Sequence, residues 1–273
     1  MSNPENNASR CSHHGPYAVC GHTDATCPEI LQNGTFADSL MPSDLDARTP
    51  SKNLAKEKIW EVGGRPEILV RERVIAPDED SEKLMDSMSK AQELFARMRA
   101  TYGISIVSAE LLGGENADGR PAIYTVVDKI EGKNVTDTEH LPDTAKDALD
   151  ALYVSLARYY DDARKQGGAY WGDCNNTQFV YGRKKDEEDA HFYLVDIGPE
   201  FYTPGQSEHF PISWPILQMC RGLVEAEKKF TPVAHLQTAR ETLLSTIEEM
   251  LKDGSINVKP LLEAKNLLER ANA

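Results

Sequence analysis

The 273-residue chain lacks any long apolar run, and this absence is the first constraint on its function. No stretch approaches the roughly 18 to 20 apolar residues that a membrane-spanning helix requires. The polar beginning, Met1–Arg10, also lacks the apolar core of a secretory signal peptide. We therefore expect no membrane partner and a cytoplasmic location.

Basic residues are scarce relative to acidic ones. The chain has 30 Lys and Arg against 44 Asp and Glu, which gives a formal net charge of −14. Because binding to nucleic acid or anionic lipid needs a Lys- and Arg-rich surface, this balance argues against either as a general partner. A local basic site remains compatible with the composition.

Cysteine is also sparse, with five residues in the whole chain. An odd number in a protein expected to be cytoplasmic argues against a disulfide framework. The three Asn-x-Thr triplets, at Asn33, Asn134 and Asn175, accordingly carry no expectation of glycosylation.

The first fifty residues form a polar segment, rich in Asn, Ser, Pro, Asp and Gly, that has too little apolar surface to offset chain entropy. We predict a mostly disordered tail over 1–50. It contains six side chains of the types that bind Zn²⁺: Cys11, His13, His14, Cys20, His22 and Cys27. Their spacing lacks the Cys-x2-Cys knuckle of known zinc fingers, so reduced thiols in a flexible tail remain the favoured interpretation over a zinc site.

Apolar content is sufficient for a core, at 40% of the chain, and the folded pattern begins near Lys56. Alternating apolar residues predict four strands, and helical spacing predicts the first helix. The predicted ranges are strands at 59–62 and 68–75 around a Gly63–Gly64 corner, a helix at 80–101, and strands at 104–112 and 122–127.

The sequence predicts five helices, and two of them have a clear apolar stripe. The first predicted helix has an apolar stripe of Leu84, Met88, Ala91, Phe95, Met98 and Tyr102. A later helix has Leu149, Leu152, Tyr153, Leu156, Tyr160 and Ala163 on one face and ends at Gly167–Gly168. Three further helices are expected near 214–229, 233–252 and 260–271.

Two short stretches, Tyr170–Gly182 and Phe192–Gly198, each place one acid beside a β-type run. The charged segment Arg183–Asp189 between them predicts a solvated turn, so the two runs should form a hairpin. That geometry brings Asp173 and Asp196 to the mouth of one hairpin. There they could orient a hydroxyl group and hold a divalent metal against phosphate oxygens.

These residues resemble the protein-kinase-like fold in its aminoglycoside-phosphotransferase-like branch. In that family a Gly-Asp with an amide residue five positions later forms the catalytic loop, and a strand-borne Asp-x-Gly follows as the metal-binding motif. The counterparts here are Gly172–Asp173, Gln178 and Asp196–Gly198. Two positions depart from the pattern, with Trp171 where the family commonly has His and Gln178 where it has Asn.

The resemblance implies an α+β, two-lobed fold with a small antiparallel-sheet lobe that has one helix and a larger, mainly helical lobe. On this basis we expect a small nucleotide-binding lobe at 51–128, a hinge at 129–134 and a large lobe at 135–273. The implied activity is ATP- and Mg²⁺-dependent transfer of the γ-phosphoryl group to a hydroxyl group.

The same resemblance assigns expected roles to individual residues. Asp173 would accept or orient the hydroxyl proton, and Asp196 would bind Mg²⁺. An amide oxygen of Gln178 or Asn176 would complete the metal shell. The hinge backbone at Lys129, Ile130 and Glu131 would bind the adenine, although a plain surface turn is the alternative there.

The nucleotide's phosphates require a positive charge, which the family supplies as a Lys on a strand of the small lobe. This strand has Arg71 and Arg73 instead, and their alternation places both on one face. Either could contact phosphate, with Arg71 slightly favoured, but Arg presents a planar fork rather than a point charge. An exposed basic strand edge is the alternative interpretation.

Other features of the family are missing. On the helix at 80–101, Glu93 lies about opposite the apolar stripe and Gln92 on its flank, so the usual Lys–Glu pair has no clear counterpart. A pseudokinase that binds nucleotide or acts as a scaffold is therefore an alternative function, and an acidic interaction protein is a third. The acceptor, whether small molecule or protein, cannot be chosen from the sequence.

Overall fold

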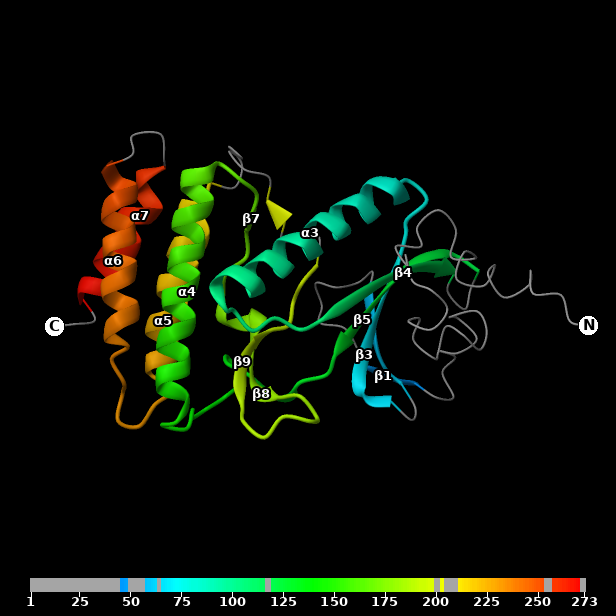
Figure 1. Ribbon diagram of the computed structural model, residues 1–273, viewed down its shortest axis with the longest axis horizontal. Helices are drawn as coiled ribbons and strands as arrows, with labels where there is room; N and C mark the ends of the chain where they lie inside the picture. Colours follow the sequence, from blue (N-terminus) through cyan, green and yellow to red (C-terminus); the bar gives the residue numbers. More distant parts are fainter. Residues whose placement is uncertain are drawn as a thin grey trace, which may run out of the picture. The chain divides into compact units, whose positions relative to one another are not determined.

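The computed structural model describes residues 45–48, 57–62, 65–115, 119–198, 202–203, 211–252 and 257–270. The chain divides into unit 1, Met1–Ser89 with Val107–Lys129, and unit 2, Lys90–Ile106 with Ile130–Ala273. Figure 1 labels the elements of both. The predicted Cys and His cluster, most of the predicted tail and the Gly63–Gly64 corner lie outside the described residues.

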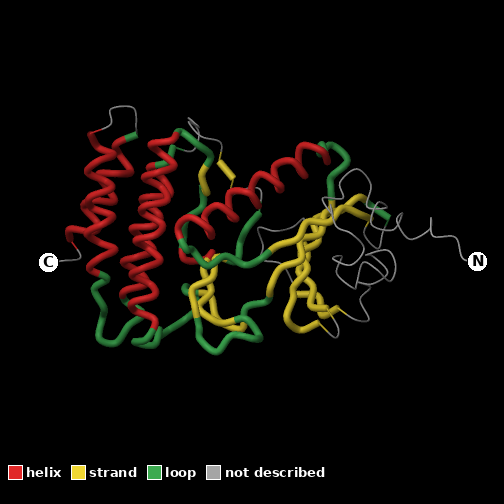
Figure 2. The backbone as a smooth tube through the Cα atoms, in the orientation of Figure 1, coloured by secondary structure: helices red, strands yellow, loops and turns green. Residues whose placement is uncertain are grey.

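Unit 1 contains a five-stranded antiparallel sheet whose strands are arranged in the order β1-β2-β3-β5-β4. Strands are drawn in yellow in Figure 2. The strands are β1 (Leu45–Arg48), β2 (Glu57–Val62), β3 (Arg65–Val74), β4 (Ala109–Glu115) and β5 (Pro121–Asp128). The predicted hairpin of β2 and β3 is confirmed, with Trp60 opposite Val70.

Two strand predictions need correction. Strand β1 lies inside the segment predicted to be mostly disordered. Its polar setting gives no local signal for a strand, and the strand is recognised by its pairing with β2. The strand predicted from Ile104 begins only at Ala109. The residues before it instead join unit 2, where the Leu194 N–H donates to the Ser105 carbonyl at 2.9 Å and Ile106 forms a parallel bridge with Leu194.

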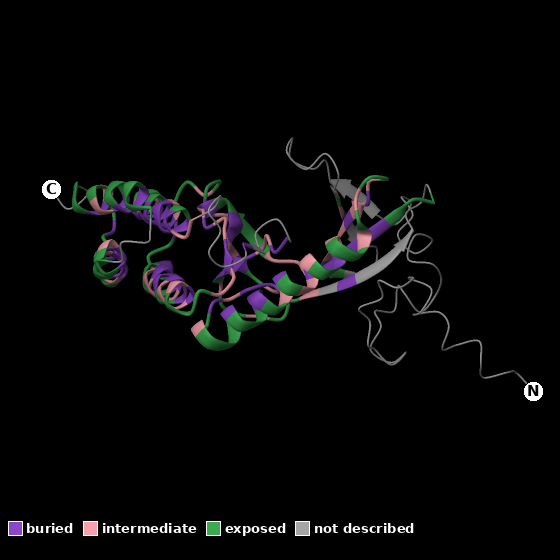
Figure 3. Ribbon diagram, turned by 90° about the horizontal axis from the view of Figure 1, so that it is seen from above, coloured by how far each residue is buried: buried purple, intermediate pink, exposed green. Residues whose placement is uncertain are grey.

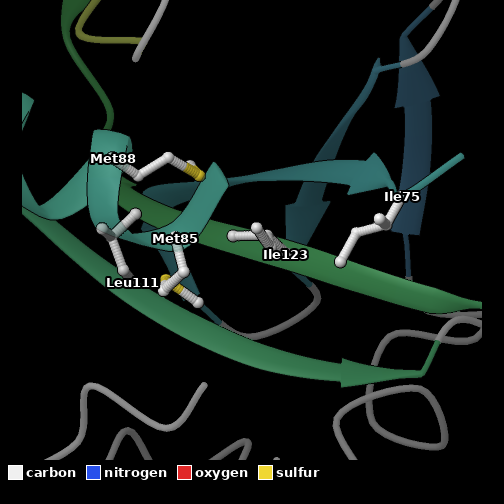
Figure 4. Packing of buried hydrophobic residues seen from close by; sticks show 5 residues of the cluster. All are labelled: Ile75, Met85, Met88, Leu111 and Ile123. Atoms are coloured by element: carbon white, nitrogen blue, oxygen red, sulfur yellow. The ribbon is translucent and has the colours of Figure 1, made fainter. Parts of the chain in front are cut away.

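Helix α3 (Ser81–Tyr102) begins at Asp80, whose Oδ1 accepts the N–H groups of Glu82 and Lys83, both at 3.1 Å. Its first turns complete an apolar cluster with the sheet (Figure 4). The cluster consists of Ile75, Met85, Met88, Leu111 and Ile123. The methionines thus fill the core of unit 1, which fits the flexible thioether side chain.

Unit 2 is mainly helical, with α4 (Ala145–Gln166), α5 (Ser213–Glu227), α6 (Gln237–Lys252) and α7 (Val258–Arg270). Helix α4 packs on α6, α5 on α7, and α6 on α7. Each helix has a buried and an exposed side (Figure 3). Antiparallel sheets with packed helices confirm the predicted mixed fold class, and none of the described helices is long and apolar enough to cross a bilayer.

The stripe predicted for α4 is confirmed, since all six of its residues are buried. Gly167 ends the helix in the left-handed conformation, with φ of 62°, and its N–H donates to the Arg164 carbonyl. A residue with a Cβ is strained at this φ, so the glycine predicted to stop the helix has a physical reason to be there.

A buried ion pair joins the last three helices. Glu227 ends α5, and Arg240 of α6 is only 1% exposed. The Arg240 Nε donates to Glu227 Oε1 at 2.6 Å, its Nη2 donates to Oε2, and its Nη1 donates to the Leu268 carbonyl of α7 at 2.8 Å. The Leu236 N–H donates to Glu227 Oε1 at 2.9 Å, so neither charge is buried without partners.

Unit 2 also contains a three-stranded antiparallel sheet, whose strands lie in the order β6-β8-β9. Its strands are β6 (Glu131–Asn134), β8 (Phe179–Arg183) and β9 (His191–Leu194). Gly132 faces Gly182 across β6 and β8. A Cβ added to Gly182 would lie 2.5 Å from the Glu131 carbonyl oxygen and 2.7 Å from the Gly132 Cα, so these backbones approach more closely than side chains permit.

We predict that Gly182→Ala destabilises unit 2 by about 1–3 kcal/mol, because backbone atoms cannot move aside as a side chain could. Chemical denaturation would measure the change in the free energy of unfolding. Gly168→Ala is the matched control, since a Cβ at Gly168 meets nothing within 4 Å. Equal effects of the two substitutions would contradict the close-approach argument.

Removing one partner of the buried ion pair should also destabilise the protein. We expect Arg240→Ala to lower the free energy of unfolding by about 3–5 kcal/mol, because Glu227 would keep its charge in a buried site. The control is Glu263→Ala, which breaks the pair that Glu263 forms with Arg221, where the side chains are 51% and 43% exposed. The loss of stability in Glu263→Ala should stay within about 1 kcal/mol. Equal losses in Arg240→Ala and Glu263→Ala would show that burial does not determine the cost of breaking an ion pair.

Candidate active site

The chain that leads to Asp173 is fixed on helix α4 by two adjacent tyrosines. Strand β7 (Tyr170–Trp171) directly precedes the Gly172–Asp173 turn. The Trp171 N–H donates to the Tyr159 hydroxyl at 2.8 Å, and the Tyr160 hydroxyl donates to the Trp171 carbonyl at 2.7 Å. Burial raises the pKa of both tyrosines well above the usual value, so their hydroxyl groups stay protonated near neutral pH.

Trp171 stands where the family that the sequence resembles commonly has His, and its side chain is buried. Its ring packs edge-to-face on Phe179, with ring centroids 5.8 Å apart. Its backbone also pairs with Tyr202 of strand β10 (Tyr202–Thr203). Trp171 is therefore a core residue that holds β7 in place, and it presents no titratable group two residues before Asp173.

Two neutral amides hold the carboxylate of Asp173, which is half-buried. Asn175 Nδ2 donates to Asp173 Oδ1 and Gln178 Nε2 donates to Oδ2, both at 2.7 Å. The short helix η3 (Asn176–Gln178) makes this possible, because one turn returns Gln178 to the side of Asp173. The amide five positions after the acid thus contacts that acid, as the motif spacing suggests.

The hairpin of β8 and β9 connects the two predicted acidic motifs. Phe179 pairs with Leu194, and the Val195 N–H donates to the Gln178 carbonyl at 3.0 Å. Gln178, which bonds to Asp173, therefore lies beside Val195, the residue before Asp196. The structure brings both motifs to the same end of one hairpin, although the chemical roles of the two acids stay predictions.

Helix α3 also reaches the second motif within unit 2. Gln92 Nε2 lies 3.5 Å from the Ile197 carbonyl oxygen, at the long limit for a hydrogen bond. Glu93 is exposed on the other side of the helix, as its place opposite the apolar stripe predicts. The amide of Gln92, on the flank of the stripe, thus lies beside the backbone of the Asp196–Gly198 motif, whereas Glu93 faces away from the stripe.

Asn176, the other amide predicted as a possible metal ligand, is held in the core by two hydrogen bonds. Its Oδ1 accepts the Tyr153 hydroxyl at 2.7 Å, and its Nδ2 donates to the Gly222 carbonyl at 2.8 Å. The side chain is buried, and both of its polar atoms are used in joining η3 to α4 and α5. Gln178 is then the amide that remains as a candidate beside Asp196.

The donor set fits a hard divalent cation such as Mg²⁺. Because Gln178 donates through Nε2, its amide oxygen is the atom left for a cation, and Asp196 adds a carboxylate. Among the described residues no group of three or more His, Cys, Asp or Glu side chains could hold a metal. Magnesium in phosphate-transfer sites is commonly held by one or two protein oxygens together with substrate phosphates, which is the number available here.

The predicted hinge residues have different backbone environments. The Lys129 N–H donates to the Glu67 carbonyl at 2.8 Å, so that donor is already used. Glu131 is paired with Arg183 in the β6–β8 ladder. Ile130, half-buried between them, stays the candidate for contact with an adenine.

The two arginines of β3 also differ. Arg73 forms an ion pair with Glu79, with Nη2 and Oε1 2.8 Å apart and both side chains largely buried. Arg71 is half-buried and lies between Ile59 and Thr125 in the sheet register. Both arginines stay predictions for the phosphate contact, with Arg71 slightly favoured by its position in the strand.

Sequence reasoning missed Tyr159 and Asn175 as residues that shape the site. Tyr159 lies beside the predicted apolar stripe of α4 rather than on it. Asn175 precedes a predicted amide ligand and carries no catalytic signature of its own. Its Asn-x-Thr triplet was a usable signal, because an Asn with a hydroxyl residue two positions later favours a side-chain-to-backbone turn.

We predict that Tyr160→Phe lowers the free energy of unfolding by about 1–3 kcal/mol, because the buried Trp171 carbonyl loses its donor. Calorimetric or denaturant unfolding would measure this. Tyr181→Phe is the control, since no hydrogen bond of the Tyr181 hydroxyl occurs among the described residues. A Tyr160→Phe protein as stable as Tyr181→Phe would show that the anchor is not required.

No protein-family model and no curated protein matches the chain. Solved structures that it resembles include WbdD, a bifunctional kinase-methyltransferase, at 14% identity and a TM-score of 0.40, covering 83% of this chain and 45% of that one. A complex of APH(2″)-IIIa with GDP and kanamycin has 13% identity and a TM-score of 0.38, covering 84% of this chain and 93% of that one. The chain thus spans less than half the length of WbdD.

Proposed function

We propose that the protein is an ATP- and Mg²⁺-dependent phosphotransferase that acts on a hydroxyl group of an unidentified small molecule or protein. One observation carries the proposal. The β8–β9 hairpin joins an acid held by a motif amide, Asp173 with Gln178, to the strand end that bears Asp196. Phosphoryl transfer needs these two functions close together, one for the attacking hydroxyl and one for the metal.

In this proposal Asp173 orients the acceptor hydroxyl and receives its proton as the hydroxyl oxygen bonds to the γ-phosphorus, while the bond from that phosphorus to the bridging oxygen breaks and ADP leaves. A positioned base of this kind contributes on the order of 10²–10⁴ in rate. Asp196 and the Gln178 amide oxygen would hold Mg²⁺, which would neutralise charge on the nucleotide's phosphates. Arg71 stays the residue that the sequence favours for a phosphate contact, and Ile130 is the proposed adenine contact.

A nucleotide-binding module without transfer activity is the second candidate. The observation that favours it is the arginine pair of β3, where the family has a Lys and where Arg73 is bound to Glu79. The two candidates differ in one measurement, which is release or transfer of phosphate with a panel of hydroxylated acceptors. Binding of Mg-ATP without any turnover across that panel would favour the module.

The metal assignment gives a direct prediction. Asp196→Ala should abolish the rise in melting temperature that Mg-ATP causes in the unchanged protein, because ligand binding stabilises the folded state by mass action. A thermal-shift titration with ATP, with and without Mg²⁺, would measure this. Asp189→Ala, in the exposed hairpin turn, is the control and should keep the full shift.

A second variant separates binding from chemistry. Asp173→Asn should keep the Mg-ATP shift and lose transfer, because the substitution removes the base but none of the proposed metal ligands.

An undiminished shift in Asp196→Ala would refute the metal assignment. No Mg-ATP shift in the unchanged protein would refute both candidates.

A further inference from the structure

Two Asn-x-Thr triplets in unit 2 adopt the same turn. In the first, Asn134 Oδ1 accepts the Thr136 N–H at 3.0 Å and its hydroxyl at 2.6 Å. In the second, Asn175 Oδ1 accepts the Thr177 N–H at 2.8 Å and also the Thr177 hydroxyl. Each threonine therefore fixes which atom of the asparagine amide faces it, and the NH₂ group must point the other way.

The outward NH₂ groups connect the two turns in series. Asn134, the last residue of β6, donates through Nδ2 to the Thr177 carbonyl at 2.5 Å. Asn175 then donates through Nδ2 to Asp173 Oδ1 at 2.7 Å. A continuous path of directed hydrogen bonds thus runs from the end of β6, through the second turn, to the carboxylate of Asp173.

We propose that this amide relay fixes the orientation of the Asp173 carboxylate, with Asn175 as a positioning residue and Asn134 acting on it through Thr177. The hydrogen bonds of the relay do not depend on the proposed function. Only the action of Asp173 on an acceptor hydroxyl rests on it. Gln178 holds the second oxygen, so rotation of the carboxylate about Cβ–Cγ is restrained at both ends.

The chemistry explains why the residue at 175 is Asn. Asp or Ser would cap η3 as well, because either offers an oxygen to the Thr177 N–H. Asp offers no donor to Asp173 and would place a second negative charge beside it, and Ser would have to accept and donate through a single hydroxyl oxygen. Asn offers the two functions on separate atoms, with Oδ1 accepting from the Thr177 N–H and Nδ2 donating to Asp173.

The restraint has a consequence for catalysis. An ionised carboxylate has about four lone-pair sites, and the two amides occupy one on each oxygen, so an acceptor hydroxyl can still bond to either. Because the carboxylate is already oriented, less rotational freedom is lost when the hydroxyl aligns with phosphorus. Misplacement of a reacting group by about 1 Å can cost 10²-fold in rate, so loss of the relay should be visible in turnover.

The relay can be tested in the full chain without any activity. Asp173→Asn should shift the side-chain NH₂ signals of Asn175 and Gln178 in a ¹H–¹⁵N spectrum, because their acceptor loses its charge. The signals are assigned by their disappearance in Asn175→Asp and Gln178→Glu. Asn257, which caps α7 through the Lys259 N–H at 3.3 Å, provides the reference signal that should not move.

Turnover supplies the second readout. Asn175→Asp keeps the cap but replaces the donor with a charged oxygen, so we expect kcat to fall by about 10- to 100-fold while KM for ATP changes less than about twofold. Asn134→Asp should cause a smaller loss, and the matched Asn257→Asp should cause none.

The outcomes separate the two proposals. An unmoved Asn175 signal in Asp173→Asn would overturn the relay, whatever the activity. Turnover of Asn175→Asp equal to that of Asn257→Asp would overturn its role in positioning. A shifted Asn175 signal in a protein that shows no Mg-ATP binding would support the relay and reject the phosphotransferase.

Discussion

The hydrogen bonds between the backbone of Trp171 and the hydroxyls of Tyr159 and Tyr160 are the contacts on which the candidate site depends. They attach the chain two residues before Asp173 to the middle of a long helix. That helix is itself fixed, since its apolar face is buried and Asp150 Oδ1 accepts the Ala239 N–H at the start of α6, at 2.8 Å. A loop residue gains the positional precision of a helix in this way, and catalytic groups need such precision.

The loop after Asp173 is attached to the same helices by a different residue. Asn176 bonds to Tyr153 of α4 and to the Gly222 carbonyl of α5, and a Cβ at Gly222 would lie 2.8 Å from Asn176 Oδ1. The buried Glu227–Arg240 pair then joins α5 to α6 and, through Leu268, to α7. Stability and site geometry are therefore coupled in unit 2, because the residues that pack the helices also hold both sides of the loop.

The sequence predicts the helices of unit 2 and the β8–β9 hairpin well, because apolar periodicity and charged turns are local signals. It fails where the determining contact is distant. Strand β1 has little apolar content and is identified only by pairing with β2. Asn176 and Gln178 are both amides near one acid, and only the distant Tyr153 and Gly222 show that Asn176 belongs to the core. The wide separation of these partners along the chain explains why residue type and spacing could not assign their roles.

The departures from the family pattern concern the supply of positive charge more than the orientation of the acid. Both hydrogen-bond partners of the Asp173 carboxylate among the described residues are neutral amides. Neutral donors align a carboxylate without pairing its charge with Lys or Arg. Amide donors also add no positive charge to a chain of net charge −14, so neutralisation of the phosphates would depend on Mg²⁺ and on an arginine. In the proposed phosphotransferase, an acid oriented by amides would make the Mg²⁺ proposed at Asp196 more important, because the divalent ion would supply the charge that the loop lacks.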